Sequence, residues 1–298
     1  MKYEFIKDNH VHWSIERMCQ VLETSSSGYY DWLNRPISKR AEEDEQLTEQ
    51  IIMFHCDSGC SYGSPRIYKD LKAAGVKTAR KRVERLMKAA AIKGKSKRKT
   101  KTTTQSKHQR PRVENLLKQD FKVEQPNQAW VSDITYLATL EGWLYLAVVL
   151  DLFSRKVIGW SFSKRLTDEL TLSALSMALK QRPASKGLIF HSDQGSQYAS
   201  KAFQAKLNKH HIQQSMSGKG NCYDNAVAES FFATLKTEEV DDKPYLTRQQ
   251  AKTSIFKYIE GFCQRSAEAS PSNTRRRHST LDYLSPSTFE GLYYGQVT

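Results

Sequence analysis

Apolar and polar residues alternate differently in different parts of the chain. From about residue 130, three short runs rich in β-branched and aromatic residues follow one another, which predicts strands at 130–139, 143–151 and 155–163. Further on, the patterns predict helices at 168–181, 200–210 and 224–239, short strands at 187–192 and 212–216, and more helix to about 262. Three successive strands followed by alternating helices and strands predict an α/β fold, a mixed sheet flanked by helices.

The first 92 residues have helical periodicity instead. Residues 1–36 are predicted to form a small helical element, and residues 41–92 carry three helix patterns. Ser64 is predicted to cap one helix, with Pro65 at its first position and Gly75 closing it, and Thr78 is predicted to cap the next helix. This second helix presents a basic face. The pair is typical of a helix-turn-helix-like domain that contacts DNA, although a helical hairpin with a solvated charged face has the same pattern. The candidate contacts are Arg80, Lys81, Arg82 and Arg85.

The charge balance favours a polyanionic partner. Lys and Arg number 46 against 32 Asp and Glu, a net charge of +14. Between Arg85 and Val113 there are eleven positive charges and no acid, which predicts a basic linker at 93–119 that follows DNA phosphates, with Lys97, Arg98 and Lys99 as candidate contacts. An anionic membrane is the poorer alternative, because the longest apolar run, 143–150, is far too short to span a bilayer.

Cysteine usage and the first residues favour a cytoplasmic protein, and the charge balance favours a place at the nucleoid. The five cysteines are odd in number and scattered, as expected of reduced thiols. Residues 1–8 are charged and mixed, unlike a secretory signal. His and Cys residues occur near positions 10–19 and 55–60, but no second close pair follows at zinc-site spacing.

Three acids stand in contexts suited to metal binding. Asp133 lies inside an apolar β-branched run, Asp193 ends another, and Glu229 is in a helix-patterned stretch, with 35 residues between Asp193 and Glu229. Carboxylates converging from two strands and a helix would suit Mg²⁺, and two such ions about 3.5–4 Å apart can drive phosphodiester chemistry. Asp151 competes for a site role, but its position before Leu152-Phe153-Ser154 favours a turn at the end of a strand.

The motifs around these acids resemble the retroviral-integrase-like D,D(35)E core of bacterial insertion-sequence transposases, the type encoded by a second reading frame. The motifs are Trp130-x-x-Asp133-x-Thr135-Tyr136, His191-Ser192-Asp193-x-Gly195-x-Gln197-Tyr198, and a third from Gly220 to Lys236 that contains Asn225 and Glu229. The resemblance implies a ribonuclease-H-like catalytic domain at 120–298, ending in a helical tail. It also implies that Asp133, Asp193 and Glu229 are catalytic and hold Mg²⁺, with Mn²⁺ as a substitute.

The same resemblance implies a DNA transposase that cleaves strands at terminal inverted repeats and transfers the 3′-hydroxyl. Its expected partners are the element ends and target DNA, further copies of itself on DNA, and the upstream reading-frame product or a frameshift fusion with it. Two rivals remain: a ribonuclease-H-like nuclease that only hydrolyses, and a non-catalytic DNA-binding regulator derived from a transposase.

Further DNA contacts are expected near the C-terminal end. Asn225 and Lys236 are predicted to share a helix face with Glu229, because they lie four residues before it and seven after it. About ten extra residues at 263–272 depart from the family pattern, which predicts a surface loop and puts the packing of this junction in doubt. The basic run that follows adds the candidates Arg275, Arg276 and Arg277.

Overall fold

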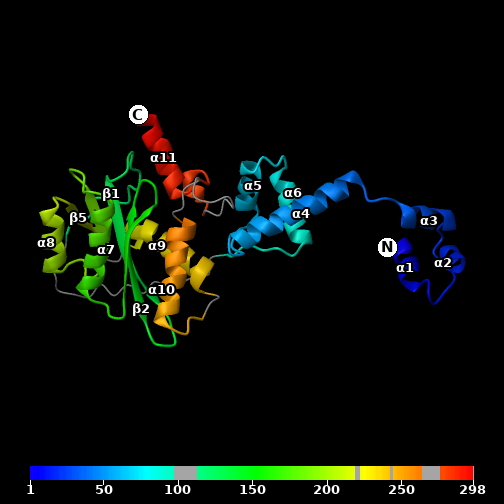
Figure 1. Ribbon diagram of the computed structural model, residues 1–298, viewed down its shortest axis with the longest axis horizontal. Helices are drawn as coiled ribbons and strands as arrows, with labels where there is room; N and C mark the ends of the chain where they lie inside the picture. Colours follow the sequence, from blue (N-terminus) through cyan, green and yellow to red (C-terminus); the bar gives the residue numbers. More distant parts are fainter. Residues whose placement is uncertain (97–112, 219–221, 242–243, 264–275, 298) are drawn as a thin grey trace. The chain divides into compact units, whose positions relative to one another are not determined.

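The computed structural model describes residues 1–96, 113–218, 222–241, 244–263 and 276–297 (Figure 1). Its contacts divide the chain into two compact units, Met1–Gln50 and Ile51–Thr298. The candidate linker contacts Lys97, Arg98 and Lys99, the extra residues at 264–272 and Arg275 lie outside the described residues.

The first unit contains three short helices, α1 (Lys2–Asn9), α2 (Ile15–Val21) and α3 (Ser26–Asn34). Their core consists of Ile6, Met18, Cys19 and Tyr29. Ser25 caps α3, because its side chain accepts a hydrogen bond from the amide of Gly28. The helix α4 (Lys39–Asp57) follows.

The predicted helix pair is formed by α5 (Ser64–Ala73) and α6 (Arg80–Ala89). Gly75, at φ +81°, closes α5 as predicted. The predicted N-cap is wrong: Gly63 precedes the helix, Ser64 is already its first residue, and Pro65 lies in the first turn. The predicted cap of α6 is wrong: the helix begins after Ala79, without a side-chain cap, and the Thr78 hydroxyl is buried with no hydrogen-bond partner among the described residues.

The second unit is built on a mixed five-stranded sheet in the order β3-β2-β1-β4-β5. β1 pairs antiparallel with β2, which pairs antiparallel with β3, while β1, β4 and β5 run parallel. This is the predicted mixed sheet, and the central strand β1 carries the first candidate acid. The strands are β1 (Ala129–Leu137), β2 (Leu144–Asp151), β3 (Val157–Ser163), β4 (Ile189–Ser192) and β5 (Gln213–Met216).

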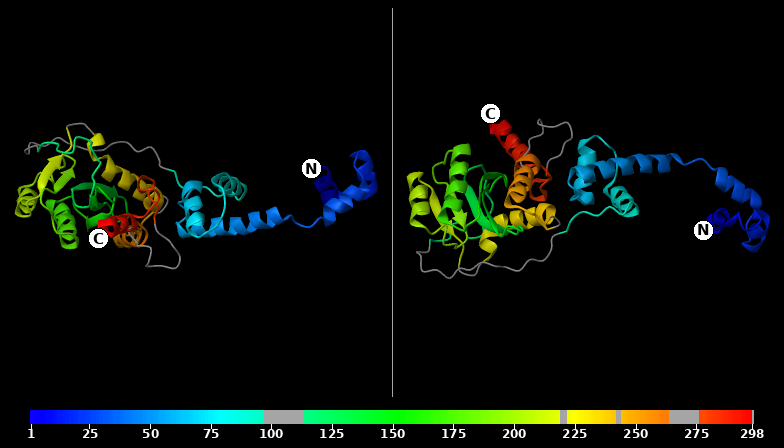
Figure 2. Two further views of the ribbon diagram at one scale, coloured as in Figure 1. Left: turned by 90° about the horizontal axis from the view of Figure 1, so that it is seen from above. Right: turned by 60° about the horizontal axis from the view of Figure 1, so that its bottom comes forward.

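Helices cover both faces of the sheet (Figures 1 and 2). α7 (Asp168–Gln181) and α8 (Lys201–Lys209) pack on one face, and α9 (Ala226–Leu235) and α10 (Arg248–Phe256) on the other. Gly159 of β3 permits the close approach of α7, since a Cβ there would lie 2.3 Å from the carbonyl oxygen of Ala174. Each face of the sheet therefore has its own apolar core.

The helix predicted at 224–239 is not continuous. A 3-10 turn, η1 (Cys222–Asn225), precedes α9, and a π-helical turn, η2 (Lys236–Val240), follows it. A second π-helical segment, η3 (Lys257–Cys263), follows α10. Beyond the extra residues come η5 (Ser279–Leu281) and α11 (Pro286–Val297). In the described parts of the chain, no helix combines the length and apolarity needed to cross a bilayer.

Asp151 has the structural role expected from its sequence context. Its side chain is fully buried at the end of β2 and accepts hydrogen bonds from the amides of Asn127 (2.8 Å) and Phe153 (2.9 Å). The Nη1 atom of Arg182 lies 3.1 Å from Asp151 Oδ2 and neutralises its charge, and Arg182 also binds Glu290 of α11. Asp151 therefore holds a turn and a helix in place and is separate from the acids discussed below.

Candidate active site

The register of two parallel strands brings Asp133 and Asp193 to the same level on neighbouring strands of the sheet. β1 and β4 pair from Ala129 opposite Ile189 to Ser132 opposite Ser192. Asp133 directly follows Ser132, and Asp193 directly follows Ser192. The two acids therefore leave the paired region at the same level, on neighbouring strands.

Electrostatic interaction between the acids agrees with this placement. Burial raises the pKa of Asp133 well above its ordinary value, and the charges of Asp193 and Glu229 raise it further. The amide of Ile134, which donates to Asp133 Oδ1 at 2.8 Å, works in the opposite direction. The amide of Gly195 donates to Asp193 Oδ1 at 3.0 Å. Like charges held this way repel one another, and a shared divalent cation would relieve the repulsion.

Glu229 approaches the pair from the first turn of α9, with an exposed side chain. Burial and the charge of Asp193 raise its pKa. Among the described residues, however, no three His, Cys, Asp or Glu side chains are grouped tightly enough to hold a metal ion. The three carboxylates thus interact electrostatically but are not grouped into the single pocket expected from the sequence. Their chemistry suits a hard, oxygen-preferring cation.

Lys236 lies close enough to influence the acids. It is the first residue of η2, half-buried, and its positive charge lowers the pKa of Asp133. A cation beside the carboxylates is suitably placed to attract a DNA phosphate. Its contact with DNA stays a prediction.

Asn225 does not share the exposed face of Glu229, so that prediction is wrong. It ends the 3-10 turn before α9, is only 3% exposed, and donates from Nδ2 to the carbonyl oxygen of Ser132 at 3.1 Å. Its Oδ1 is buried and has no hydrogen-bond partner among the described residues. Asn225 therefore fastens the start of α9 to β1, one residue before Asp133.

Arg276 and Arg277 are also buried, at 6% and 7% exposure, and this burial argues against the predicted contact with DNA. Arg276 binds Glu238 of η2 through Nε to Oε2 (2.8 Å) and Nη2 to Oε1 (2.9 Å). Arg277 pairs with Asp70 of α5. Both guanidinium groups neutralise buried carboxylates from distant parts of the chain, which explains their burial.

The junction beside the extra residues is well packed, although its packing was in doubt from the sequence. The amide of Arg276 donates to the carbonyl oxygen of Phe262 at 2.7 Å, so the described residues on either side of the extra stretch are in direct contact. Cys263, at the other end of the inserted stretch, is 3% exposed and belongs to the apolar core. The insertion therefore leaves the ends of the junction joined.

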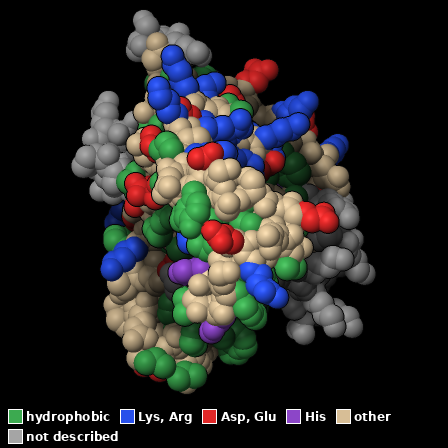
Figure 3. Space-filling view, turned by 90° about the vertical axis from the view of Figure 1, so that its right-hand side faces the viewer, with side chains coloured by type: hydrophobic (Ala, Val, Ile, Leu, Met, Phe, Trp, Pro, Cys, Tyr) green, Lys and Arg blue, Asp and Glu red, His purple; other side chains and the backbone are tan. Residues whose placement is uncertain are grey.

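The basic face predicted for α6 is accessible. Arg80, Lys81 and Arg85 are exposed and Arg82 is half-buried. Arg80 pairs with Glu84 of the same helix at 2.8 Å, a surface pair that leaves the positive face in place. Lys and Arg side chains gather in the upper part of the face shown in Figure 3. A positive surface of this kind suits a polyanion.

Two buried polar side chains, those of Tyr198 and His191, form hydrogen bonds near the acids, and neither was expected from the sequence to have a role. The Tyr198 hydroxyl lies 2.8 Å from Ser132 Oγ, in the residue before Asp133. The His191 ring lies 2.8 Å from Ser215 Oγ and 3.3 Å from Ser217 Oγ, and burial lowers its pKa to about 4, so the ring is neutral. Both residues belong to the motif around Asp193. A polar side chain within an apolar run was the feature of the sequence that could have indicated their buried hydrogen bonds.

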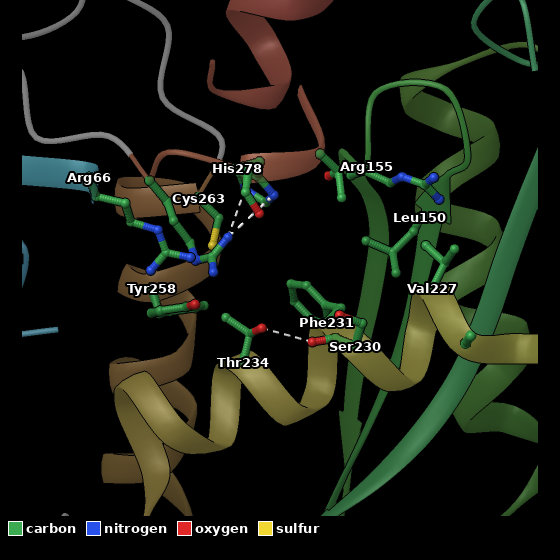
Figure 4. Close-up of a pocket in the computed structure, with 14 residues that line it drawn as sticks. Arg66, Leu150, Arg155, Val227, Ser230, Phe231, Thr234, Tyr258, Cys263 and His278 are labelled. Atoms are coloured by element: carbon green, nitrogen blue, oxygen red, sulfur yellow. Dashed lines mark hydrogen bonds between the residues drawn. The ribbon is translucent and has the colours of Figure 1, made fainter. Parts of the chain in front are cut away.

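The side of α9 away from the acids lines a cavity of about 310 Å³ (Figure 4). Val227, Phe231 and Thr234 of α9 face Tyr258 and His278 across it. Asp133, Asp193 and Glu229 are not among its lining residues. The helix that carries Glu229 thus separates two different environments.

A mixed sheet of this order, with Asp133 in its central strand and Asp193 directly after the neighbouring parallel strand, defines an integrase-type, ribonuclease-H-like catalytic core. The family model described as integrase core domain matches residues 123–222 and, in a second version, residues 210–286, and one described as HTH-like domain matches residues 42–100. The chain belongs to the IS3-type insertion-sequence transposases, which are DDE polynucleotidyl transferases acting on DNA.

Two relatives illustrate the membership. "Transposase InsF for insertion sequence IS3A" of Escherichia coli (strain K12) is 42% identical over 292 residues, 97% of this chain and 98% of the relative. "Insertion element IS600 uncharacterized 31 kDa protein" of Shigella sonnei is 41% identical over 277 residues, 93% of this chain and 98% of the relative. Both similarities run through the helical region and the integrase core.

Among solved structures, the chain is similar to the HTLV-2 integrase catalytic core domain in complex with magnesium (trimeric form). The TM-score is 0.39 and the identity 24%, over 52% of this chain and 96% of that one. It is also similar to a chain of the simian T-cell lymphotropic virus intasome in complex with PP2A regulatory subunit B56 gamma. There the TM-score is 0.42 and the identity 21%, over 67% and 66% of the two chains.

Proposed function

We propose that this transposase cleaves DNA at the terminal inverted repeats of its element and transfers the freed 3′-hydroxyl to target DNA. In cleavage, a water oxygen attacks phosphorus and the 3′ oxygen leaves, taking a proton. In transfer, the 3′-hydroxyl oxygen loses its proton and attacks a target phosphorus, whose own 3′ oxygen leaves. The observation that carries the proposal is the parallel register that brings Asp133 and Asp193 together, with Glu229 interacting electrostatically with both.

Asp133, Asp193 and Glu229 are the residues that would hold Mg²⁺, with Mn²⁺ as a substitute. Bound metal supplies activation of the attacking oxygen and stabilisation of the leaving oxygen. The chain's own part is to fix the ligands: backbone amides hold one oxygen each of Asp133 and Asp193. Asn225 ties the helix bearing Glu229 to β1.

DNA is bound, in this proposal, by exposed basic groups outside the acidic cluster. Lys236 holds a phosphate beside the acids, and the exposed residues of α6 take the duplex further away. The basic linker at 93–119 follows phosphates between the helix pair at 41–92 and the catalytic domain at 120–298. The buried residues Asn225, Arg276 and Arg277 have no part in binding DNA.

The proposal extends to partners and location. Strand transfer joins two element ends to one target, so several copies acting together on paired ends provide the necessary active sites. The upstream reading-frame product, alone or fused by frameshifting, contributes recognition of the ends, and the cell compartment is the cytoplasm, at the nucleoid. Family membership and the net charge of +14 support these statements.

Replacing Glu229 with Gln tests the proposal, because it removes a ligand charge while keeping the volume. We expect cleavage and joining to be lost while the affinity for DNA stays within about twofold of the wild type. Glu16→Gln, at an exposed glutamate of α2, is the matched control and should keep full activity. Equal loss of affinity and chemistry in the Glu229 variant would show a structural role instead. Hydrolysis without joined product would favour the nuclease rival.

A further inference from the structure

The cavity beside α9 combines an apolar wall with a group of cations. Val227 and Phe231 of α9 form part of the wall, and Arg66, Arg155 and Arg276 also line the cavity (Figure 4). No Asp or Glu is found among the described residues that line it. Its volume of about 310 Å³ lies at the small end of the range of about 300–1,000 Å³ that is typical of ligand sites. Size and lining therefore suit a small molecule with a negative charge.

The positive charges gather around His278, which also lines the cavity. Arg276 and Arg66 share one carboxylate, that of Glu238, at 2.8 and 3.1 Å. Arg276 Nη1 also lies 3.2 Å from His278 Nε2. Burial lowers the pKa of His278 well below its ordinary value, and the charges of all three arginines lower it further. The ring is therefore neutral, and the three guanidinium groups lie within electrostatic reach of it.

Arg155 is the cation of this group with the least compensation. Its Nη1 atom is buried and has no hydrogen-bond partner in the described part of the chain. Burial lowers the pKa of its guanidinium group, and the charge of Asp151 opposes that effect. Asp151 is itself paired with Arg182 at 3.1 Å. A buried N–H without a partner costs free energy, which an anion bound beside it would recover.

We infer that the cavity binds a small organic phosphate, with the phosphate at the arginines and a flat apolar body against Val227 and Phe231. Three guanidinium groups with one carboxylate between them leave two positive charges, which match the charge of about −2 on a phosphate monoester. Guanidinium groups bind phosphate oxygens through paired hydrogen bonds, and burial of a ring adds affinity. Ser279 and Thr280 line the cavity and are exposed, so a small molecule can enter. Because the acids do not line this cavity, the inference goes beyond the proposed function.

The position of the cavity gives its ligand an effect on α9. Val227, Phe231 and Thr234 are four and three residues apart, so they share one side of the helix. Glu229, two residues from each of the first two, lies on the opposite side. The π-helical turn η2, which follows α9 directly, carries Glu238 and through it two of the arginines. A ligand held by the arginines and by α9 together should therefore restrict local opening of the helix that carries Glu229.

The test measures the binding of phenyl phosphate, inorganic phosphate and phenol to the full-length chain by NMR titration. We expect phenyl phosphate to bind at least about tenfold more tightly than either fragment, because charge and ring are recognised together. Arg155→Gln should weaken its binding by about 10- to 100-fold, as expected for the loss of a hydrogen bond between buried charged groups. Arg165→Gln, at an exposed arginine that does not line the cavity, is the matched control and should bind phenyl phosphate as the wild type does. A cavity that holds only water predicts that phenyl phosphate binds no more tightly than inorganic phosphate.

A second variant leaves the charges unchanged. Thr234→Phe places a ring in the cavity and should abolish the binding of phenyl phosphate. At about ten times its dissociation constant, phenyl phosphate should slow hydrogen exchange of the amides at 230–235 about tenfold in the wild type, and leave it unchanged in Thr234→Phe. Phenyl phosphate bound no more tightly than inorganic phosphate, undiminished binding in either cavity variant, or unchanged exchange in wild-type α9 would each overturn the inference. These measurements use neither DNA nor metal, so their result is independent of the proposed function.

Discussion

Replacing Glu238 with Gln should destabilise the second unit strongly, because Glu238 is the centre of a buried charge cluster. Its side chain accepts from Arg276 through both oxygens at 2.8 and 2.9 Å, from Arg66 at 3.1 Å and from the Tyr258 hydroxyl at 2.7 Å. The amide of Gln keeps the volume but removes the charge and leaves Arg276, only 6% exposed, without a countercharge. Breaking a buried pair in this way costs about 3–5 kcal/mol.

The measurement is thermal and urea unfolding of the full chain. We expect the melting temperature of the second unit to fall by about 6–20 °C, from about 2–4 °C per kcal/mol for a unit of this size. Asp282→Asn is the matched control, since Asp282 pairs with Lys69 at 3.3 Å and is 88% exposed. The control should cost less than about 1 kcal/mol. Equally small losses of stability in Glu238→Gln and Asp282→Asn would refute the assignment of Glu238 as the centre of a buried charge cluster.

The same cluster predicts a pH dependence with a definite sign. Burial raises the pKa of Glu238, but Arg276, Arg66 and the Tyr258 hydroxyl outweigh burial, so its pKa is lowered. A carboxyl with a lowered folded-state pKa stabilises the fold above its unfolded pKa of about 4.3, and the stabilisation is lost as pH falls through the folded value. The difference in unfolding free energy between wild type and Glu238→Gln should therefore shrink below about pH 4. A difference that grows with acid would contradict the assigned charge state.

Three further predictions concern packing, positioning and DNA. Gly159→Ala should destabilise the fold by about 1–3 kcal/mol in urea unfolding, because its Cβ would meet the Ala174 carbonyl; an unchanged midpoint would mean that α7 can shift. Asn225→Leu should lower the joining rate at least tenfold while DNA affinity is kept, since it frees α9 from Ser132; loss of affinity measured by filter binding would restore Asn225 as a DNA contact. Neutralising four linker cations should flatten the salt slope on duplex DNA by about 3.6, at about 0.9 each, and an unchanged slope would leave the helix pair as the main contact. The four are Lys97, Arg98, Lys99 and Lys101.

The sheet could be predicted from sequence because its strands are apolar, β-branched and separated by clear turn residues. The run from Trp143 to Leu150 is β2 almost unchanged, and Asp151 was recognised as a turn former by its place after that run. Helix ends were harder. The expected cap at Thr78 failed because helix α6 begins one residue later, and local sequence does not distinguish neighbouring starts.

The candidate site was predictable in its acids and much less so in its basic residues. Asp133 and Asp193 each directly follow a stretch of parallel pairing, and both stand within or after apolar runs that the sequence shows. The partners of Arg276 and Arg277 are 38 and 207 residues away in the chain, so nothing local distinguishes these buried cations from the exposed ones of α6. Asn225 was misplaced because the regular helix pattern conceals the 3-10 turn that ends at this residue.

The most direct test is a joining assay with the full-length chain, labelled DNA carrying the element's own end with a free 3′-hydroxyl, and an unlabelled target plasmid. With Mg²⁺ we predict that label becomes covalently attached to the plasmid, and that Asp193→Asn abolishes this product while binding the labelled end as the wild type does. Labelled end bound by the wild type but never joined in Mg²⁺ or Mn²⁺, or joined equally well by Asp193→Asn, would contradict the assignment of Asp133, Asp193 and Glu229 as the catalytic residues.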